Sequence, residues 1–150
     1  MVRHVWTVLC SKTATDKDSN NISLFEVVEQ IQVTGPGGAL AEPVLVPTSL
    51  ELVSLWARAD FGTPTRGTTR VVILFPDGHV AGQAEMDVDL AAVQRTRTIV
   101  KFPALPFRLP GVMRFVVSLR QDNAEEWTEV ASVPLNVERL EGTQAPAPAH

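Results

Sequence analysis

Apolar and polar residues alternate along the segment Val112-Met113-Arg114-Phe115-Val116-Val117-Ser118-Leu119-Arg120. In an extended chain, one face carries the apolar side chains of Met113, Phe115, Val117 and Leu119. The opposite face carries Arg114, Ser118 and Arg120, with Val116 as the one apolar exception. Successive side chains of a β-strand point to opposite faces, so this pattern predicts a strand with one buried face.

A second alternating segment follows the polar loop 121–126. Its predicted inner face carries Trp127, Ala131, Val133, Leu135 and Val137. The two segments and the loop between them predict a β-hairpin. Pro134 lies inside the second strand, and proline has no backbone N–H, so we expect an edge strand or a bulge at this position.

The other apolar runs of the chain are also short and lie between turn residues. They predict strands at 2–10, 50–61, 70–75 and 95–102, and Pro76-Asp77-Gly78 predicts a turn. The runs 35–38 and 42–47 are rich in Gly and Pro and predict loops or an irregular edge. The whole pattern predicts an all-β fold, a single β-sandwich of about 7–9 mostly antiparallel strands, Ig-like or a related Greek key.

The segment 22–33 fits two kinds of secondary structure. A helix would align Leu24, Val27, Val28 and Ile31, and Ser23 with Glu26 would form a capping box. A strand would align Phe25, Val27, Ile31 and Val33, with Glu29 as the misfit. We predict a strand because the rest of the chain has a β pattern, and the helix stays as the alternative.

Length and composition exclude several classes of protein. The 150 residues include 13 Lys and Arg, 17 Asp and Glu, and one Cys, with a net charge of −4. A single Cys excludes an intramolecular disulfide and a Cys-rich zinc module, and the lack of a basic block argues against nucleic-acid binding. We expect one β-sandwich domain at 1–139 and a flexible Ala/Pro tail at 140–150.

The start of the chain has no apolar segment typical of a signal peptide. No stretch approaches the roughly 18 apolar residues that a membrane-spanning helix needs. We therefore expect a cytoplasmic protein without a membrane partner.

Three segments resemble a family of uncharacterised bacterial Ig-like β-sandwich proteins. They are Val5-Trp6-Thr7-Val8-Leu9-Cys10, Asn20-Asn21-Ile22-Ser23-Leu24-Phe25, and the Leu-Pro-Phe-x-Leu-Pro-Gly run at 105–111 that leads into 111–117. The resemblance covers residues 2 to about 139. It implies an Ig-like sandwich and favours a strand at 22–33, and it implies no catalytic residue because the family has no assigned activity.

Oxygen-bearing side chains alternate at Asp16, Asp18 and Asn20, as they do in calcium-binding loops. An EF-hand would need Gly where this chain has Asn21 and a bidentate Glu where it has Val27. A calcium site in a β-sandwich needs less regular spacing, so these three residues are the candidate metal ligands. The alternative is a solvated turn, for which Asp and Asn are well suited.

The sequence predicts no catalytic residue and no cofactor. Glu85, Asp87 and Asp89 share one strand face, and we expect them to pair across strands with Arg95 and Arg97 instead of acting as catalytic carboxylates. The histidines have no metal-ligand spacing, and the chain lacks the Gly-x-Ser-x-Gly motif.

The cysteine and the tryptophans are expected in the interior. Cys10 follows an apolar run, so we predict a buried and unreactive thiol. Trp6, Trp56 and Trp127 lie among apolar neighbours, and we predict core packing for them, with stacking of sugar rings on an exposed Trp as the alternative.

These patterns favour a non-catalytic structural or protein-interaction module. Predicted edge strands near 44–46 and 135–137 could pair with a partner protein or with a second copy of the chain. The alternative function is a ligand-binding sandwich for calcium or carbohydrate.

Overall fold

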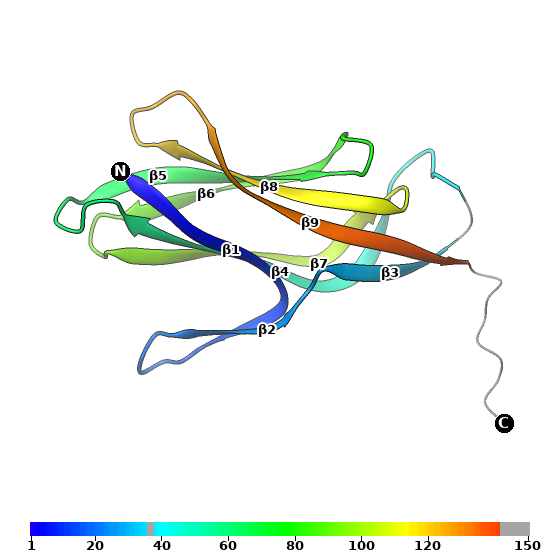
Figure 1. Cartoon of the computed structure of the whole chain (residues 1–150), viewed down its shortest axis with the longest axis horizontal. Coiled ribbons are helices and arrows are strands. Elements are labelled where there is room, and N and C mark those ends of the chain that lie inside the picture. The colour runs from blue at the N-terminus through cyan, green and yellow to red at the C-terminus, as the bar shows by residue number, and fades with distance from the viewer. Residues whose placement is uncertain (36–37, 142–150) are drawn as a thin grey trace.

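All nine regular elements of the described residues are strands (Figure 1). The structure is a computed structural model that describes residues 1–35 and 38–141. The strands are β1 (Val2–Thr15), β2 (Ile22–Val27), β3 (Gln30–Gly35), β4 (Val44–Arg58), β5 (Thr65–Leu74), β6 (Val80–Leu90), β7 (Arg95–Phe107), β8 (Gly111–Gln121) and β9 (Thr128–Glu141). Among these residues, no helix is long and apolar enough to cross a membrane.

The strands form two sheets, which pack face to face. The first sheet has the order β2-β1-β4-β7, and the second has the order β3-β9-β8-β5-β6. All neighbouring strands are antiparallel except β3 and β9, which are parallel. The predicted all-β sandwich of mostly antiparallel strands is therefore confirmed.

The β8–β9 hairpin lies at the centre of the core, as its alternation predicts. Met113, Phe115 and Val117 are 0% exposed and Leu119 is 5% exposed. These side chains belong to one hydrophobic cluster with residues of the facing sheet such as Trp56. Each buried apolar side chain of this size stabilises the fold by about 1.5–3 kcal/mol, so this hairpin supplies much of the packing energy.

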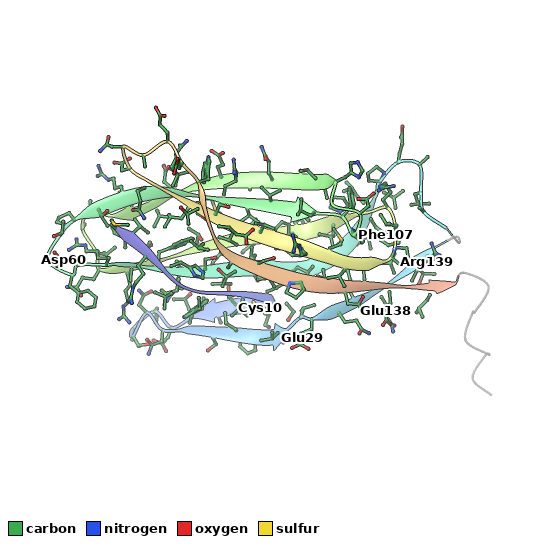
Figure 2. The ribbon with its side chains drawn as sticks, turned by 45° about the horizontal axis from the view of Figure 1, so that its top comes forward. Cys10, Glu29, Asp60, Phe107, Glu138 and Arg139 are labelled. Carbon is green, nitrogen blue, oxygen red and sulfur yellow. The ribbon has the colours of Figure 1, made fainter. Side chains whose placement is uncertain are left out.

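The segment 22–33 forms strands, as we predicted, but two of them instead of one. β2 pairs with β1 in the first sheet, whereas β3 pairs with β9 in the second. The chain crosses between the sheets at residues 28–29, just after Glu26 takes a positive φ of 55°. Figure 2 shows Glu29 at this crossing. The mixed periodicity of the segment reflects two short strands that face different surroundings.

Pro134 lies on a locally open edge, in agreement with its predicted position. β3 pairs with β9 only from Asn136 onward, and the Asn136 N–H donates to Glu29 O across that side. Alternate residues of a strand direct their N–H groups to the same side. The missing N–H of Pro134 therefore faces this open side and not the ladder with β8.

The first hairpin does not continue the plane of its sheet. β1 pairs with β4 only as far as Cys10 and then bends, and its remaining residues pair with β2 (Figure 1). Glu51 on β4 accepts two hydrogen bonds from Thr13, one from the backbone N–H and one from the hydroxyl. Arg97 on β7 donates to the backbone oxygen of Asn20 at the hairpin tip. The hairpin thus folds back over the outer face of the first sheet.

Val53 shows the effect of this cover on β4. It alternates with the core residue Leu52 and is not part of the core cluster, yet it is 0% exposed. The same holds for Cys10 at the bend (Figure 2). The first sheet therefore buries side chains on both faces.

The structure describes only part of the predicted tail at 140–150 and of the predicted loop at 35–38. Residues 140 and 141 belong to β9 and not to a tail. The rest of the predicted tail, 142–150, and residues 36–37 of the predicted loop lie outside the described residues.

Candidate functional site

The predicted calcium ligands lie together in the tight turn between β1 and β2. One carboxylate oxygen of Asp16 accepts the backbone N–H groups of Asp18 and Ser19, both at 2.8 Å. These bonds, the one from Ser19 first, lower the pKa of the Asp16 carboxyl. Asn20 takes a positive φ of 60°, a conformation that Asn tolerates better than most residues. The turn geometry alone explains why Asp and Asn occupy these positions.

Protein donors already bind two of the three candidate ligands. Besides the bonds at Asp16, the guanidinium of Arg97 lies 2.9 Å from the backbone oxygen of Asn20 and 3.3 Å from its Oδ1. No cluster of three or more His, Cys, Asp or Glu side chains suited to a metal ion occurs in residues 1–35 and 38–141. Calcium binding at Asp16, Asp18 and Asn20 stays a prediction, and the arrangement favours a turn held by hydrogen bonds.

The acidic stripe has different partners from those we predicted. Glu85, Asp87 and Asp89 do share the exposed face of β6, but β6 pairs with β5 and not with the strand of Arg95 and Arg97. Asp89 forms an ion pair of 3.2 Å with Arg66, and Glu85 lies opposite Arg70. The prediction was wrong because the chain changes sheets after β6 instead of forming a hairpin with β7.

The three tryptophans lie in three different surroundings. Trp56 is fully buried, and its Nε1–H donates to Thr98 Oγ1 at 3.0 Å, so core packing is confirmed there. Trp127 precedes β9, and the guanidinium carbons of Arg70 and Arg120 lie over its ring, 4.3 and 4.7 Å from the ring centroid. Trp6 is half-buried and lines a cleft under the β1–β2 hairpin. Core packing was therefore the wrong prediction for Trp127 and Trp6.

Cys10 and His4 are the groups of the first sheet that could act as a nucleophile or a base, and Cys10 is buried while His4 is half-buried. Cys10 is buried as predicted, and burial, followed by the charge of Glu51, raises the pKa of its thiol. His4 Nε2 lies 2.7 Å from Thr7 Oγ1, which lies 2.8 Å from the hydroxyl of the buried Ser54. Burial lowers the pKa of His4. This chain of hydroxyls satisfies buried polar groups, which is a structural task.

One of the two predicted edge segments is an edge and the other is not. Residues 44–46 pair with β7, and β1 meets β4 only from Glu51 onward, so this part of β4 is paired on one side. Residues 136 and 137 pair with both β8 and β3, so the prediction of an open edge at 135–137 was wrong. The parallel strand β3, which sequence patterns did not reveal, covers this part of β9.

Most open edges of the sandwich carry features that oppose strand pairing. β6 carries three carboxylates, and β7 carries two prolines and three basic residues. The open side of β1 is closed at one end by Gln121, whose amide forms two bonds of 2.8 Å with the backbone of Val2. At its other end Leu9 O accepts the Val28 N–H, and a bulge lies between His4 and Trp6.

β2 is an edge strand with fewer of these features, since it carries one carboxylate, Glu26. Its sequence Ile-Ser-Leu-Phe-Glu-Val contains no proline and no basic residue, and it pairs only with β1. Phe25 is 44% exposed and Val27 is 60% exposed. On β3, by contrast, the exposed side chains are the polar ones of Gln30, Gln32 and Thr34. The sequence signal was the alternation of Phe25 and Val27, which the strand prediction placed on one face with Ile31 and Val33.

The comparisons with known proteins add little to this geometry. No protein-family model and no curated protein matches the chain. An immunoglobulin-like protein from Pseudomonas aeruginosa is similar in structure, with 13% identity, a TM-score of 0.39, and coverage of 92% of this chain and 97% of that chain. The N-terminal domain of PorA has 11% identity, a TM-score of 0.29, and coverage of 89% and 97%. The fold class therefore rests on the sheets described above.

Proposed function

We propose that the protein is a non-catalytic interaction module that adds a strand of a second copy of the chain to the open edge of β2. The observation that carries this proposal is that β2 presents an open edge with only one charged residue, Glu26, and with Phe25 and Val27 exposed. Strand addition to such an edge uses the backbone groups for affinity and alternate side chains for specificity.

The chemistry of β2 supports pairing with its own copy. A two-fold axis would place two β2 strands antiparallel, and facing residues of antiparallel strands project to the same side of a sheet. Phe25 and Val27 of one copy would then pack beside those of the other. Lys12, whose Nζ lies 5.1 Å from the Phe25 ring, would remain at the rim of the contact.

The contact would be small, because β2 has only six residues. Interfaces at the low end of the size range belong to weak and transient complexes. We therefore expect self-association in about the 10–1000 μM range, which suits a module that assembles at high local concentration.

Sedimentation velocity of the full chain at rising concentration tests this proposal. We expect a monomer–dimer equilibrium in the wild type that Phe25→Lys abolishes, since the substitution places two cations side by side across the axis. Val80→Lys is the matched control, because Val80 is 60% exposed on a different strand. Circular dichroism checks that both variants keep the fold.

Two outcomes would overturn the proposal. One is a wild-type chain that stays monomeric at 1 mM, a concentration that corresponds to roughly 4 kcal/mol of binding free energy. The other is a dimer that survives Phe25→Lys or that Val80→Lys weakens equally. Either result would place any contact of the module elsewhere than β2.

A further inference from the structure

A cleft of about 800 Å³ lies between the tip of the β1–β2 hairpin and the outer face of the first sheet. Residues 19–22 line the cleft from the tip of the hairpin. Residues 93–97 line it from the β6–β7 turn and the start of β7. Trp6 and Leu55 line it from the sheet. Small-molecule sites in proteins commonly have volumes of about 300–1,000 Å³. The lining includes Ile22 of β2 but neither Phe25 nor Val27, the exposed residues of the edge described above.

The charges that line this cleft are all of one sign. Among the described residues, Arg95 and Arg97 are the only ionisable ones in the lining, which includes no Asp or Glu of residues 1–35 and 38–141. Within the part of the chain that the structure describes, neither guanidinium forms an ion pair with a carboxylate. The two residues are two positions apart on β7, so their side chains leave the same face of the strand.

One of the two guanidinium groups is held in a fixed position. Arg97 donates through one terminal nitrogen to both oxygens of Asn20, at 2.9 and 3.3 Å. An arginine has five N–H donors in a planar fork, so the remaining donors keep their capacity for a carboxylate or a phosphate. In the same turn, Oδ1 of Asp16 accepts the backbone N–H groups of Asp18 and Ser19.

An aromatic ring stands in the same row as the fixed guanidinium. The sheet register aligns Trp6 on β1 with Leu55 on β4, and Leu55 with Arg97 on β7. The bulge between His4 and Trp6 changes the register that brings Trp6 into this row. An indole ring and cationic donors that line the same cleft suit a ring with a negative charge, because the indole offers apolar contact while the charge meets the arginines.

We propose that this cleft binds an anionic sugar, a pyranose ring with a carboxylate or phosphate group. Arg97 and Arg95 would bind the anion, and the Trp6 ring would contact the face of the sugar. The side-chain amides of Asn21 and Gln94, which also line the cleft, would donate to ring hydroxyls.

The test is an NMR titration of the full chain with four matched probes: glucuronic acid, glucose 6-phosphate, glucose and inorganic phosphate. We expect the two charged sugars to shift the Trp6 indole N–H and the backbone amides of residues 20–21, with dissociation constants at least about fivefold lower than for glucose or phosphate alone. The two charged sugars separate a carboxylate source from a phosphate source. Added salt should weaken the binding.

Three variants complete the test. Arg97→Gln should weaken binding of the charged sugar at least about tenfold, because it removes a charge-assisted donor pair. Trp6→Phe should retain binding, while Trp6→Leu should weaken it. Arg66→Gln on the other sheet is the matched control and should leave binding unchanged.

The proposal fails if no probe shifts these signals, or if glucose binds as well as the charged sugars. It also fails if inorganic phosphate binds as tightly as glucose 6-phosphate, since the ring would then contribute nothing. Equal losses in Arg97→Gln and Arg66→Gln would likewise overturn it. These outcomes do not depend on dimerisation, which is measured separately.

Discussion

The β8–β9 and β1–β2 hairpins use similar strands in opposite ways. In the β8–β9 hairpin, one face lies in the core, and Phe115 is 0% exposed. In the β1–β2 hairpin, none of the β2 side chains is fully buried, and Phe25 is 44% exposed. The β8–β9 hairpin stabilises the sandwich through its buried face. The β1–β2 hairpin covers the outer face of the first sheet and shapes a cleft. The comparison shows that an alternation of apolar and polar residues predicts a strand. The alternation does not show whether the apolar face lies in the core or at the surface.

The largest expected effect separates the two phenylalanines. Phe115→Ala leaves a cavity in the core, so we expect a loss of about 3–5 kcal/mol in the free energy of unfolding. Phe25→Ala should change it by less than about 0.5 kcal/mol, because the ring is exposed. Urea denaturation of both variants, at a concentration where the wild type is monomeric, measures the difference. Losses of similar size would contradict the division between the hairpins.

A smaller effect is expected where the β1–β2 hairpin is attached to β4. Glu51→Ala removes the acceptor of two hydrogen bonds from Thr13, so we expect a loss of about 1 kcal/mol and more frequent opening of the hairpin. Opening would expose the Cys10 thiol, and the lost negative charge would also lower its pKa. The rate of labelling by a thiol reagent should therefore rise severalfold.

Glu51→Gln is the control for this prediction, because it removes the charge but keeps an oxygen acceptor. A labelling rate that rises in Glu51→Ala and much less in Glu51→Gln would assign the effect to the hydrogen bonds. An unchanged rate in Glu51→Ala would mean that other contacts hold the hairpin in place.

The next effect is a pH dependence of stability, and it concerns the part of β1 that pairs with β4, where His4 lies. Burial lowers the pKa of His4 below its usual 6.5, so the unfolded chain binds protons more readily than the folded protein. Stability is complete above pH 6.5 and declines as the pH falls below that value. Urea midpoints at pH 7.5, 6.5 and 5.5 should show this decline in the wild type and a smaller one in His4→Gln. Parallel declines would exclude His4 as the cause.

The smallest effect is expected on the exposed face of the second sheet. Arg66 and Asp89 form an ion pair whose side chains are both 60% exposed, and such pairs contribute little to stability. Arg66→Ala should leave the melting temperature unchanged within error. The pKa of Asp89 should stay low, because the Ala91 N–H lowers it more than Arg66 does. A clear drop in melting temperature would show that charge on this face matters as much as packing.

The sequence predicted correctly the strands that have one face in the core and the other in contact with water. The alternation of Phe115 and its neighbours is one example, and the strand face shared by Glu85, Asp87 and Asp89 is another. It failed where the chain changes sheets, because adjacency in sequence then no longer means adjacency in a sheet. The pairing expected between the acidic residues of β6 and the two arginines at 95 and 97 failed for this reason.

The cleft under the hairpin was beyond sequence reasoning for a related reason. It depends on the bend of β1 after Cys10, which brings Asn20 to Arg97, a residue 77 positions later in the chain. The alternation of apolar and polar residues does not predict such a bend. The turn residues Asp16 and Asn20 were predicted with Asp18 as metal ligands, and this stays a prediction; one side-chain oxygen of Asp16 and one of Asn20 accept hydrogen bonds from protein donors.

The parallel pairing of β3 with β9 has a consequence for how the chain folds. Gln30 pairs with Asn136, and the backbone of Val2 bonds to Gln121 across 119 positions. Contacts between such distant segments slow folding, because the intervening chain must be ordered before they form. During synthesis, β3 must wait for almost all the described strands to leave the ribosome before it gains its partner. Until then, its unpaired edge is exposed to other nascent chains, which makes early chaperone contact advantageous.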